Sequence, residues 1–253
     1  MVRGFYSAAA GVLSQQKAID AISNNITNAA TTGYKSQSTA ESSFGEHLVS
    51  RMTPLPGAGN SNIGPGAFMT VNSQAYVDYT QGMLENTGRS VDIAIQGEGF
   101  FVINSEKYGE VLTRNGQFEL DADGDLILPG VGKVQSEGGR DINLETSDFT
   151  VGKDGTIYVD GRDVEKINIA SGKDNPELVK IGQGSFFNAE GYERADENEF
   201  FLIQGSIEKA NVNIAKEMSR IIAGQGNFTS CTQILKIYDR INELTVNRIG
   251  NIE

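Results

Sequence analysis

The sequence predicts an α+β protein in which N- and C-terminal helices form a coiled coil and an antiparallel β-rich domain lies between them. Heptad repeats of apolar residues at both ends predict the helices, and alternating short runs predict the strands. Charge separates the same regions. The 253-residue chain has a net charge of −12, yet both ends are nearly neutral and the acidic residues concentrate in residues 36–209. We therefore expect packed ends and a solvated middle.

The first predicted element is an amphipathic helix over residues 3–30, within a terminal domain that comprises residues 1–35 and 210–253. Its apolar residues recur every seven positions, with a second set three residues later. The first set is Phe5, Val12, Ile19 and Ile26, and Ile22 belongs to the second. Gly33 can adopt the left-handed conformation after the last turn, so we expect the helix to end there.

The next segment, residues 36–84, is predicted to be an extended connector. Pro54, Pro56 and Pro65 crowd together with four glycines in residues 54–66. Such a composition favours extended chain over a packed element.

Residues 85–209 are predicted to form a β-rich outer domain. Residues 91–95 alternate between polar and apolar, residues 97–99 read as a turn, and residues 100–103 read as a second strand. Asp123-Gly124 and Asp154-Gly155 predict hairpin turns. Further strands are predicted at Gln117–Leu120, Asp125–Leu128, Thr156–Val159, Lys166–Ile169 and Glu199–Ile203.

The last element is a second amphipathic helix over about residues 211–247. Its seam residues are Ile214, Ile221, Phe228 and Leu235, and the stripe is broadened by Met218, Ile234, Tyr238 and Ile241. Gly224 and Gly226 conflict with this prediction, because each glycine costs about 1 kcal/mol in a helix interior. We expect close packing or a weak point there.

Composition excludes several classes of function. An acidic chain with few basic clusters argues against a nucleic-acid partner, because affinity for phosphates depends on Lys and Arg. One cysteine, Cys231, and one histidine exclude disulfides within the chain and metal sites built from several Cys or His residues. No apolar run approaches the roughly 20 residues of a membrane span, so no membrane insertion is expected. The N-terminus does not resemble an ordinary signal peptide.

The remaining chemical candidates are weak. Asp121–Asp125 is acidic, but its glycine is out of phase with a calcium-binding loop, so a hairpin turn is the better interpretation. No acidic residue is distinguished as a catalytic carboxylate, and the glycine spacing of a phosphate-binding loop is absent. We therefore predict no enzyme activity, no metal and no cofactor.

Three asparagines near the end of the first helix need an explanation, since asparagine is a mediocre helix former. Asn24, Asn25 and Asn28 could mark a fraying helix end. They could instead form a polar interface, in which amides bind neighbouring chains and fix the register of the helices. Composition alone favours neither.

Several motifs together resemble the bacterial flagellar rod and hook proteins. The N-terminal signature consists of residues 4–11, Gln15-Gln16, residues 24–29 and Thr31–Lys35. Residues 90–101, 112–118 and 154–156 look like the β-domain motifs of that family, and residues 205–213 look like the lead-in to its C-terminal helix. The resemblance covers nearly the whole chain in the right order.

The resemblance implies a structural subunit of the flagellar basal-body rod, closest to the distal and proximal rod proteins. Such a subunit polymerises into a helical tube that transmits torque for motility. Its implied partners are copies of itself, other rod and hook subunits, and the flagellar type III export apparatus. One departure is Gly226, which stands where the family usually has an arginine.

Two alternatives remain open within this interpretation: a hook or hook-associated subunit, and a secreted acidic β-domain that binds a ligand and sits on a helical stalk. A cell-wall glycan hydrolase ranks last. For the rod subunit, the expected assembly interface is formed by Phe5, Val12, Ile19, Ile22, Asn24, Asn25, Ile26, Asn28, Gly33, Tyr34, Ile214, Met218, Ile221, Phe228, Leu235 and Tyr238.

Overall fold

A computed structural model describes residues 2–51, 61–144, 146, 148–171, 180–181, 186–188, 192–196 and 198–250. The chain divides into two compact units. The first comprises Met1–Ile26, Gln37–Val77 and Ile214–Glu253, and the second comprises Thr27–Ser36 and Asp78–Asn213. Residues 27–36 thus pack with the β-rich unit, whereas the sequence grouped residues 1–35 with the helices.

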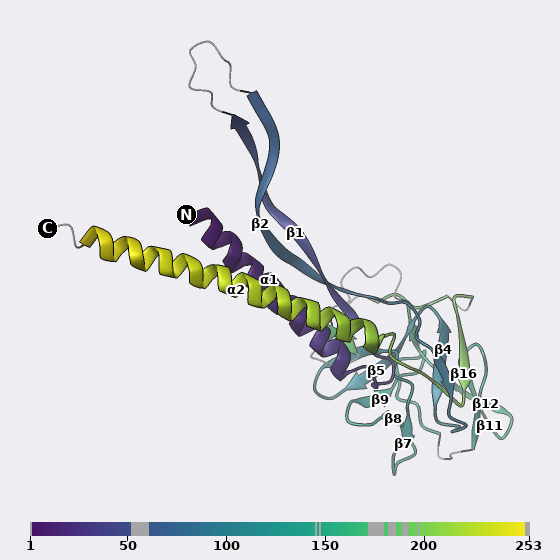
Figure 1. The fold of residues 1–253 in the computed structure, drawn as a ribbon. Helices are drawn as coiled ribbons and strands as arrows, with labels where there is room; N and C mark the ends of the chain where they lie inside the picture. The colour runs from purple at the N-terminus through teal and green to yellow at the C-terminus, as the bar shows by residue number, and fades with distance from the viewer. Residues whose placement is uncertain are drawn as a thin grey trace. The chain divides into compact units, whose positions relative to one another are not determined.

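Both predicted helices are present, and Figure 1 shows them side by side. Helix α1 spans Val2–Thr27 and α2 spans Ile214–Gly250. Gly33 has the predicted left-handed backbone, with φ of +69°. It does not cap α1, however, because the helix ends earlier, at Thr27. A Cβ at Gly33 would collide with the backbone of Arg114 and Asn115, so a close chain approach also requires glycine there.

The segment predicted as a connector contains a long antiparallel ribbon. Strands β1 (Gln37–Arg51) and β2 (Ser61–Val77) pair from Gln37 opposite Val77 to Arg51 opposite Ser61. The chain is extended, as predicted, but its backbone groups bond to each other. Pro65 lies within β2, which is possible because each strand of a two-stranded ribbon has an unpaired edge. Pro54 and Pro56 lie outside the described residues.

The second unit contains the predicted antiparallel β-rich domain. Its strands, within the described residues, are β3 (Leu84–Asn86), β4 (Ile93–Gly97), β5 (Phe100–Ser105), β6 (Gly109–Thr113), β7 (Glu119–Leu120), β8 (Leu126–Leu128), β9 (Gly132–Val134), β10 (Phe149–Val151), β11 (Thr156–Val159), β12 (Arg162–Lys166), β13 (Ile169–Ala170), β14 (Lys180–Ile181), β15 (Phe186–Asn188), β16 (Phe200–Gln204) and β17 (Ser206–Glu208).

These strands form several small sheets. The largest has the order β14-β15-β6-β5-β9-β8-β7, with β13 also paired to β5. Strands β10, β11 and β12 form a second sheet, and the pairs β16-β4 and β17-β3 complete the described sheets. The predicted turns at Asp123-Gly124 and Asp154-Gly155 do connect paired strands, β7 with β8 and β10 with β11.

The core of the second unit surrounds β5, which is buried on both faces. Phe101 and Ile103 belong to the main apolar cluster, with β4, β6 and β8 residues around them. Phe100 instead packs its ring against Tyr79 and Phe187. A strand buried on both faces has a continuous apolar run, which explains why residues 100–103 do not alternate.

Candidate assembly interface

Three glycine positions show where α1 and α2 meet within the first unit. A Cβ added at Gly4 would collide with the Tyr238 ring, one at Gly11 would lie 3.2 Å from Cys231 Sγ, and one at Gly224 would lie 3.3 Å from Ile19 Cγ1. Residue numbers rise along α1 as they fall along α2, so the helices are antiparallel. The α2 contacts at 224, 231 and 238 are seven residues apart, which is the spacing of a heptad seam.

The predicted seam residues lie mostly on the less exposed faces of these helices. Ile22 is buried, with 5% of its surface exposed. The partly buried positions are Phe5, Val12, Ile19 and Ile26 on α1 and Ile221, Phe228, Leu235 and Tyr238 on α2. These side chains are therefore partly covered within a single chain. Ile214 and Met218 differ, because about half of each side chain is exposed.

A second apolar stripe on α2 remains exposed, and the sequence analysis did not separate it from the seam. It consists of Ile234, Ile237, Ile241 and Leu244, which are 41–59% exposed. Their spacing of three, four and three residues places them on one helix face. Ile241 and Leu244 also lie beyond Tyr238, the α2 residue that meets Gly4 near the start of α1. The sequence signal that distinguishes this stripe is a second heptad spacing, of Ile234 with Ile241 and of Ile237 with Leu244, which is offset from the first.

The asparagine cluster has a role within the chain. The Asn25 side chain is 1% exposed. Its Nδ2 donates to the Gln37 carbonyl at 2.7 Å, and the Gln37 N–H donates to its Oδ1 at 2.8 Å. This reciprocal pair holds the first residue of β1 against the last turns of α1. Near the helix end, the Thr31 N–H donates to the Asn28 carbonyl at 3.0 Å. Asn24 and Asn28 are partly exposed, and their role between subunits stays a prediction.

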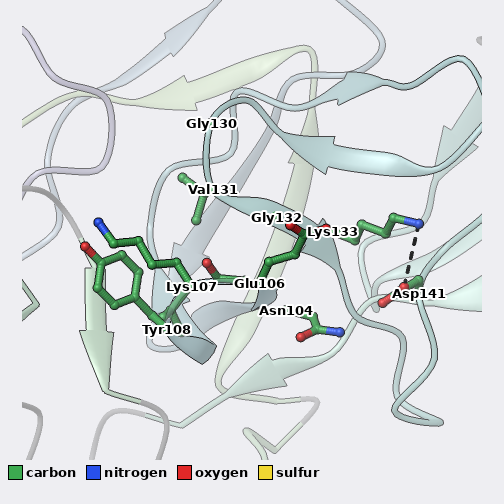
Figure 2. A pocket seen from close by; sticks show the side chains of 11 residues that line it. Asn104, Glu106, Lys107, Tyr108, Gly130, Val131, Gly132, Lys133 and Asp141 are labelled. Carbon is green, nitrogen blue, oxygen red and sulfur yellow. Dashed lines mark ion pairs between the residues drawn. The ribbon is translucent and has the colours of Figure 1, made fainter.

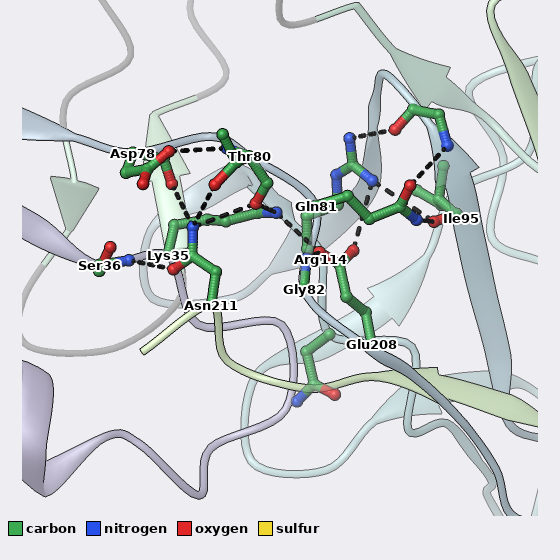
Figure 3. A network of polar contacts seen from close by, with 12 residues as sticks. Lys35, Ser36, Asp78, Thr80, Gln81, Gly82, Ile95, Arg114, Glu208 and Asn211 are labelled. Atoms are coloured by element: carbon green, nitrogen blue, oxygen red, sulfur yellow. Dashed lines mark hydrogen bonds and ion pairs between the residues drawn. The ribbon is translucent and has the colours of Figure 1, made fainter. Parts of the chain in front are cut away.

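Gly33 and Tyr34 lie inside the second unit. Tyr34 is fully buried, so its side chain offers no surface to a neighbouring copy in this conformation. The adjacent Lys35 is also fully buried. Its Nζ lies 2.7 Å from Glu208 Oε1 and donates to the Thr80 carbonyl at 2.8 Å. Figure 3 shows this buried network.

Arg114 completes the network from the other side of Glu208. Its guanidinium lies 3.3 Å from Glu208 Oε2 and donates to the Gly97 carbonyl at 2.8 Å. Burial lowers the pKa of Lys35 below its ordinary value, although the Glu208 carboxylate opposes that shift. Burial likewise lowers the pKa of Arg114 against the attraction of Glu208. The three groups were not predicted as a site, because they are far apart in the sequence.

The acidic Asp121–Asp125 segment forms the predicted hairpin turn. The Gly124 N–H donates to the Asp121 carbonyl at 3.0 Å. Asp125 accepts from Lys133 at 2.5 Å and from Asn143 at 2.7 Å, and these two donors lower its pKa. The carboxylate is thus occupied by a lysine and an amide. Among the described residues, no group of three or more His, Cys, Asp or Glu side chains is placed to hold a metal ion.

A recess of about 580 Å³ lies where the β5–β6 turn meets the β8–β9 turn. Figure 2 shows Glu106, Lys107 and Tyr108 on one side and Gly130–Lys133 on another. Lys133 within it is paired with Asp125 and Asp141. The lining is mixed, with apolar Val111 and Val131 beside charged side chains such as Glu106 and Lys107. In the described part of the chain, neither helix has the length and hydropathy required to cross a membrane.

Family models match the chain in three successive regions. Residues 5–35 match the flagella basal body rod protein model, residues 94–159 match the flagellar hook protein FlgE/F/G D1 domain, and residues 203–248 match the flagellar basal body rod FlgEFG protein C-terminal model. The first and third matches cover most of α1 and α2, and the second covers much of the β-rich unit.

Known proteins of similar length match end to end. The flagellar basal-body rod protein FlgF of Caulobacter vibrioides is 26% identical over the whole of both chains. FlgG, the basal-body rod protein of Bacillus subtilis, is 28% identical over 98% of this chain and 99% of its own length. The hook protein FlgE of Helicobacter mustelae is 34% identical, but over only 53% of this chain and 30% of its own length. The chain belongs to the flagellar basal-body rod and hook protein family.

Proposed function

We propose that this chain is a structural subunit of the flagellar basal-body rod and that it polymerises into a tube through its paired terminal helices. The observation that carries the proposal is the match of both terminal helices and the β-rich unit, in order, to rod proteins of the same length. A non-enzymatic role agrees with these relatives, whose names describe rod components. The basal body is accordingly the location of the protein.

The antiparallel contacts between α1 and α2 support a coiled coil formed within each subunit. In this arrangement the predicted seam closes inside the chain, and the exposed stripe Ile234, Ile237, Ile241 and Leu244 packs against neighbouring subunits. Fully burying one such side chain contributes about 1.5–3 kcal/mol. Contacts of this kind, repeated head to tail without closing, produce an open helical assembly.

Length favours a rod subunit over a hook subunit. The matched hook protein extends far beyond the aligned region, whereas the rod relatives align over essentially their full length. The stalk alternative requires terminal helices that do not pair with each other, and the contacts at Gly4, Gly11 and Gly224 oppose it. Export through the flagellar type III apparatus remains a prediction from the family resemblance.

The assembly surface can be tested with Ile237→Asp. Ile237 is 59% exposed, so the aspartate remains solvated in the free subunit but carries an unpaired charge into an apolar contact in the assembled rod. In a host strain that lacks its own copy of the gene, we expect the variant to be produced and folded but absent from purified hook-basal bodies, with swimming lost.

The matched control is Asn242→Asp, which adds the same charge at an exposed position of α2 that is already polar. We expect this variant to assemble and swim normally. Normal incorporation of the Ile237→Asp protein would exclude the stripe as an assembly contact. Loss of assembly by both variants would mean that added charge, rather than the stripe, is responsible.

A further inference from the structure

Two chain segments that lead to the terminal helices bond directly to each other inside the second unit. The Gly33 N–H donates to the Glu208 carbonyl at 2.7 Å, and the Ser36 N–H donates to Asn211 Oδ1 at 2.7 Å. Residues 33–36 follow α1, and residues 206–211 precede α2. The last residues of the N-terminal segment therefore dock onto a surface that the C-terminal segment supplies.

The charges at this junction are unequal. Lys35 and Arg114 are both buried, with side chains 1% and 5% exposed, and both form ion pairs with the carboxylate of Glu208. Asp78 and Glu98 act on the two cations only from exposed positions, where water screens their charge. Arg114 Nε is buried without a hydrogen-bond partner in the described part of the chain, so this cation already lacks one of its hydrogen bonds.

Removing either segment has different consequences. Without residues 33–36, Glu208 and Arg114 still form a neutral pair, and the Gly82 N–H still donates to Glu208 Oε1 at 2.8 Å. Without residues 206–211, docking of the N-terminal segment would bury two cations together with no anion between them. Uncompensated buried charge is strongly destabilising, and the Lys35 ammonium would lose its ion pair with Glu208 while its bond to the Thr80 carbonyl remains.

We propose that Glu208 is an ordering lock: residues 33–36 dock on the β-rich unit only after residues 206–211 are in place. The N-terminal segment is made first, yet its docking site is completed by a residue near the end of the chain. The segment that follows α1 and the segment that precedes α2 consequently become fixed to each other. In a chain that lacks residues 206–211, residues 33–36 stay undocked.

Native-state hydrogen exchange of the full chain tests this order without any substitution. The reporters are the amides of Gly33 and Ser36 for the N-terminal segment. For the C-terminal segment the reporter is the Lys209 amide, which donates to the Met83 carbonyl at 2.9 Å. As denaturant is added, we expect the Gly33 and Ser36 amides to open with the Lys209 amide or before it. Opening of Lys209 while Gly33 and Ser36 stay protected would overturn the proposal.

Substitutions test whether the charge of Glu208 controls the docking of residues 33–36. Glu208→Gln keeps the shape but leaves two cations, and we expect exchange at Gly33 and Ser36 to accelerate by about a hundredfold. Lys35→Met should accelerate exchange at the Lys209 amide by less than Glu208→Gln accelerates exchange at Gly33 and Ser36, because the Glu208–Arg114 pair persists. In the double variant Lys35→Met/Glu208→Gln, one of the two cations is gone, so exchange at Gly33 should be slower than in Glu208→Gln alone.

The matched control is Glu85→Gln. Glu85 lies on β3, beside β17, and its ion pair with Lys209 is about half exposed on both sides. The same change of charge on the neighbouring strand should leave exchange at Gly33 and Ser36 unchanged. If Glu85→Gln accelerates it as much as Glu208→Gln, or if the double variant exchanges as fast as the simple product of the single effects, the lock is refuted.

Discussion

At the scale of single residues, hairpin turns form from contacts between chain neighbours, whereas the Lys35–Glu208–Arg114 network joins residues far apart in the chain. The Asp123-Gly124 turn was predictable because turn preference acts over two residues, and Gly124 adopts the expected positive φ of +81°. The Lys35–Glu208–Arg114 network was not predictable, since nothing local shows that positions 35, 114 and 208 converge. Asn25 stands out in the sequence because asparagine is a mediocre helix former, but its partner Gln37 lies in a segment whose composition predicts a connector.

Asp125 provides a prediction at this scale. Lys133 and Asn143 lower its pKa in the folded state, so the folded protein binds fewer protons than the unfolded chain near the ordinary carboxyl pKa. The contribution to stability is therefore full above a pH of about 4 and is lost as the pH falls through the lowered pKa. We expect Asp125→Asn to lower Tm by about 2–4 °C at neutral pH and to match the wild type in strong acid.

Thermal melts of both proteins between neutral and acidic pH measure this difference. Asp123→Asn removes the same charge from the same turn, and it should change Tm little at any pH because Asp123 is exposed. A gap between wild type and Asp125→Asn that stays constant into strong acid would show that the ion pair is not its source.

At the scale of elements, periodicity identified both helices and some of the strands, among them β4, β5, β8, β11 and β16, but it did not identify which elements pair. The turn at residues 97–99 separates two strands, as predicted, yet β4 pairs with β16 while β5 pairs with β6, β9 and β13. A heptad repeat likewise predicts that a helix has an apolar seam, but it does not indicate which helix packs against that seam. Here α2 meets α1 of the same chain, with glycines at the contacts Gly4–Tyr238, Gly11–Cys231 and Gly224–Ile19.

The two glycines of α2 allow the effect of helix propensity on stability to be measured separately from the effect of packing. A Cβ at Gly226 meets no atom within 4 Å, so Gly226→Ala should increase the free energy of unfolding of the helical unit by about 1 kcal/mol. A Cβ at Gly224 would lie 3.3 Å from Ile19 Cγ1. Gly224→Leu should therefore decrease that free energy by about 1–3 kcal/mol, despite the better helix propensity of leucine. Urea unfolding followed by circular dichroism at the helical band measures both.

Ala223→Leu is the control for the larger side chain, because Ala223 lies on the exposed face beside Gly224. It should leave stability nearly unchanged. Equal stability of the Gly224→Leu and Ala223→Leu proteins would show that α1 and α2 do not pack at this position in solution.

At the scale of the whole molecule, the charge distribution predicted the division into apolar ends and an acidic middle, and the family resemblance predicted the rod. The boundaries were harder to predict, because residues 27–36 belong to the β-rich unit rather than to the helical domain, and the β1–β2 ribbon belongs with the helices rather than to a separate connector. A short segment such as residues 33–36 is part of the compact unit whose core buries its side chains. That burial depends on Glu208 and Arg114, which a search for local patterns does not connect with it.

The two units should differ in resistance to protease, because one has a deep apolar core and the other ends in an exposed helix. All residues from Asp239 to Arg248 of α2 are exposed, and they follow Tyr238, which lies against Gly4 near the start of α1. In the free subunit we expect trypsin to cut first at Arg240 and Arg248, leaving a fragment that retains residues 78–213. In isolated hook-basal bodies the same two sites should resist, because neighbouring subunits cover the stripe. Mass spectrometry of the fragments identifies each cut, and equal cleavage at Arg240 in free and assembled protein would place this end of α2 outside the assembly contacts.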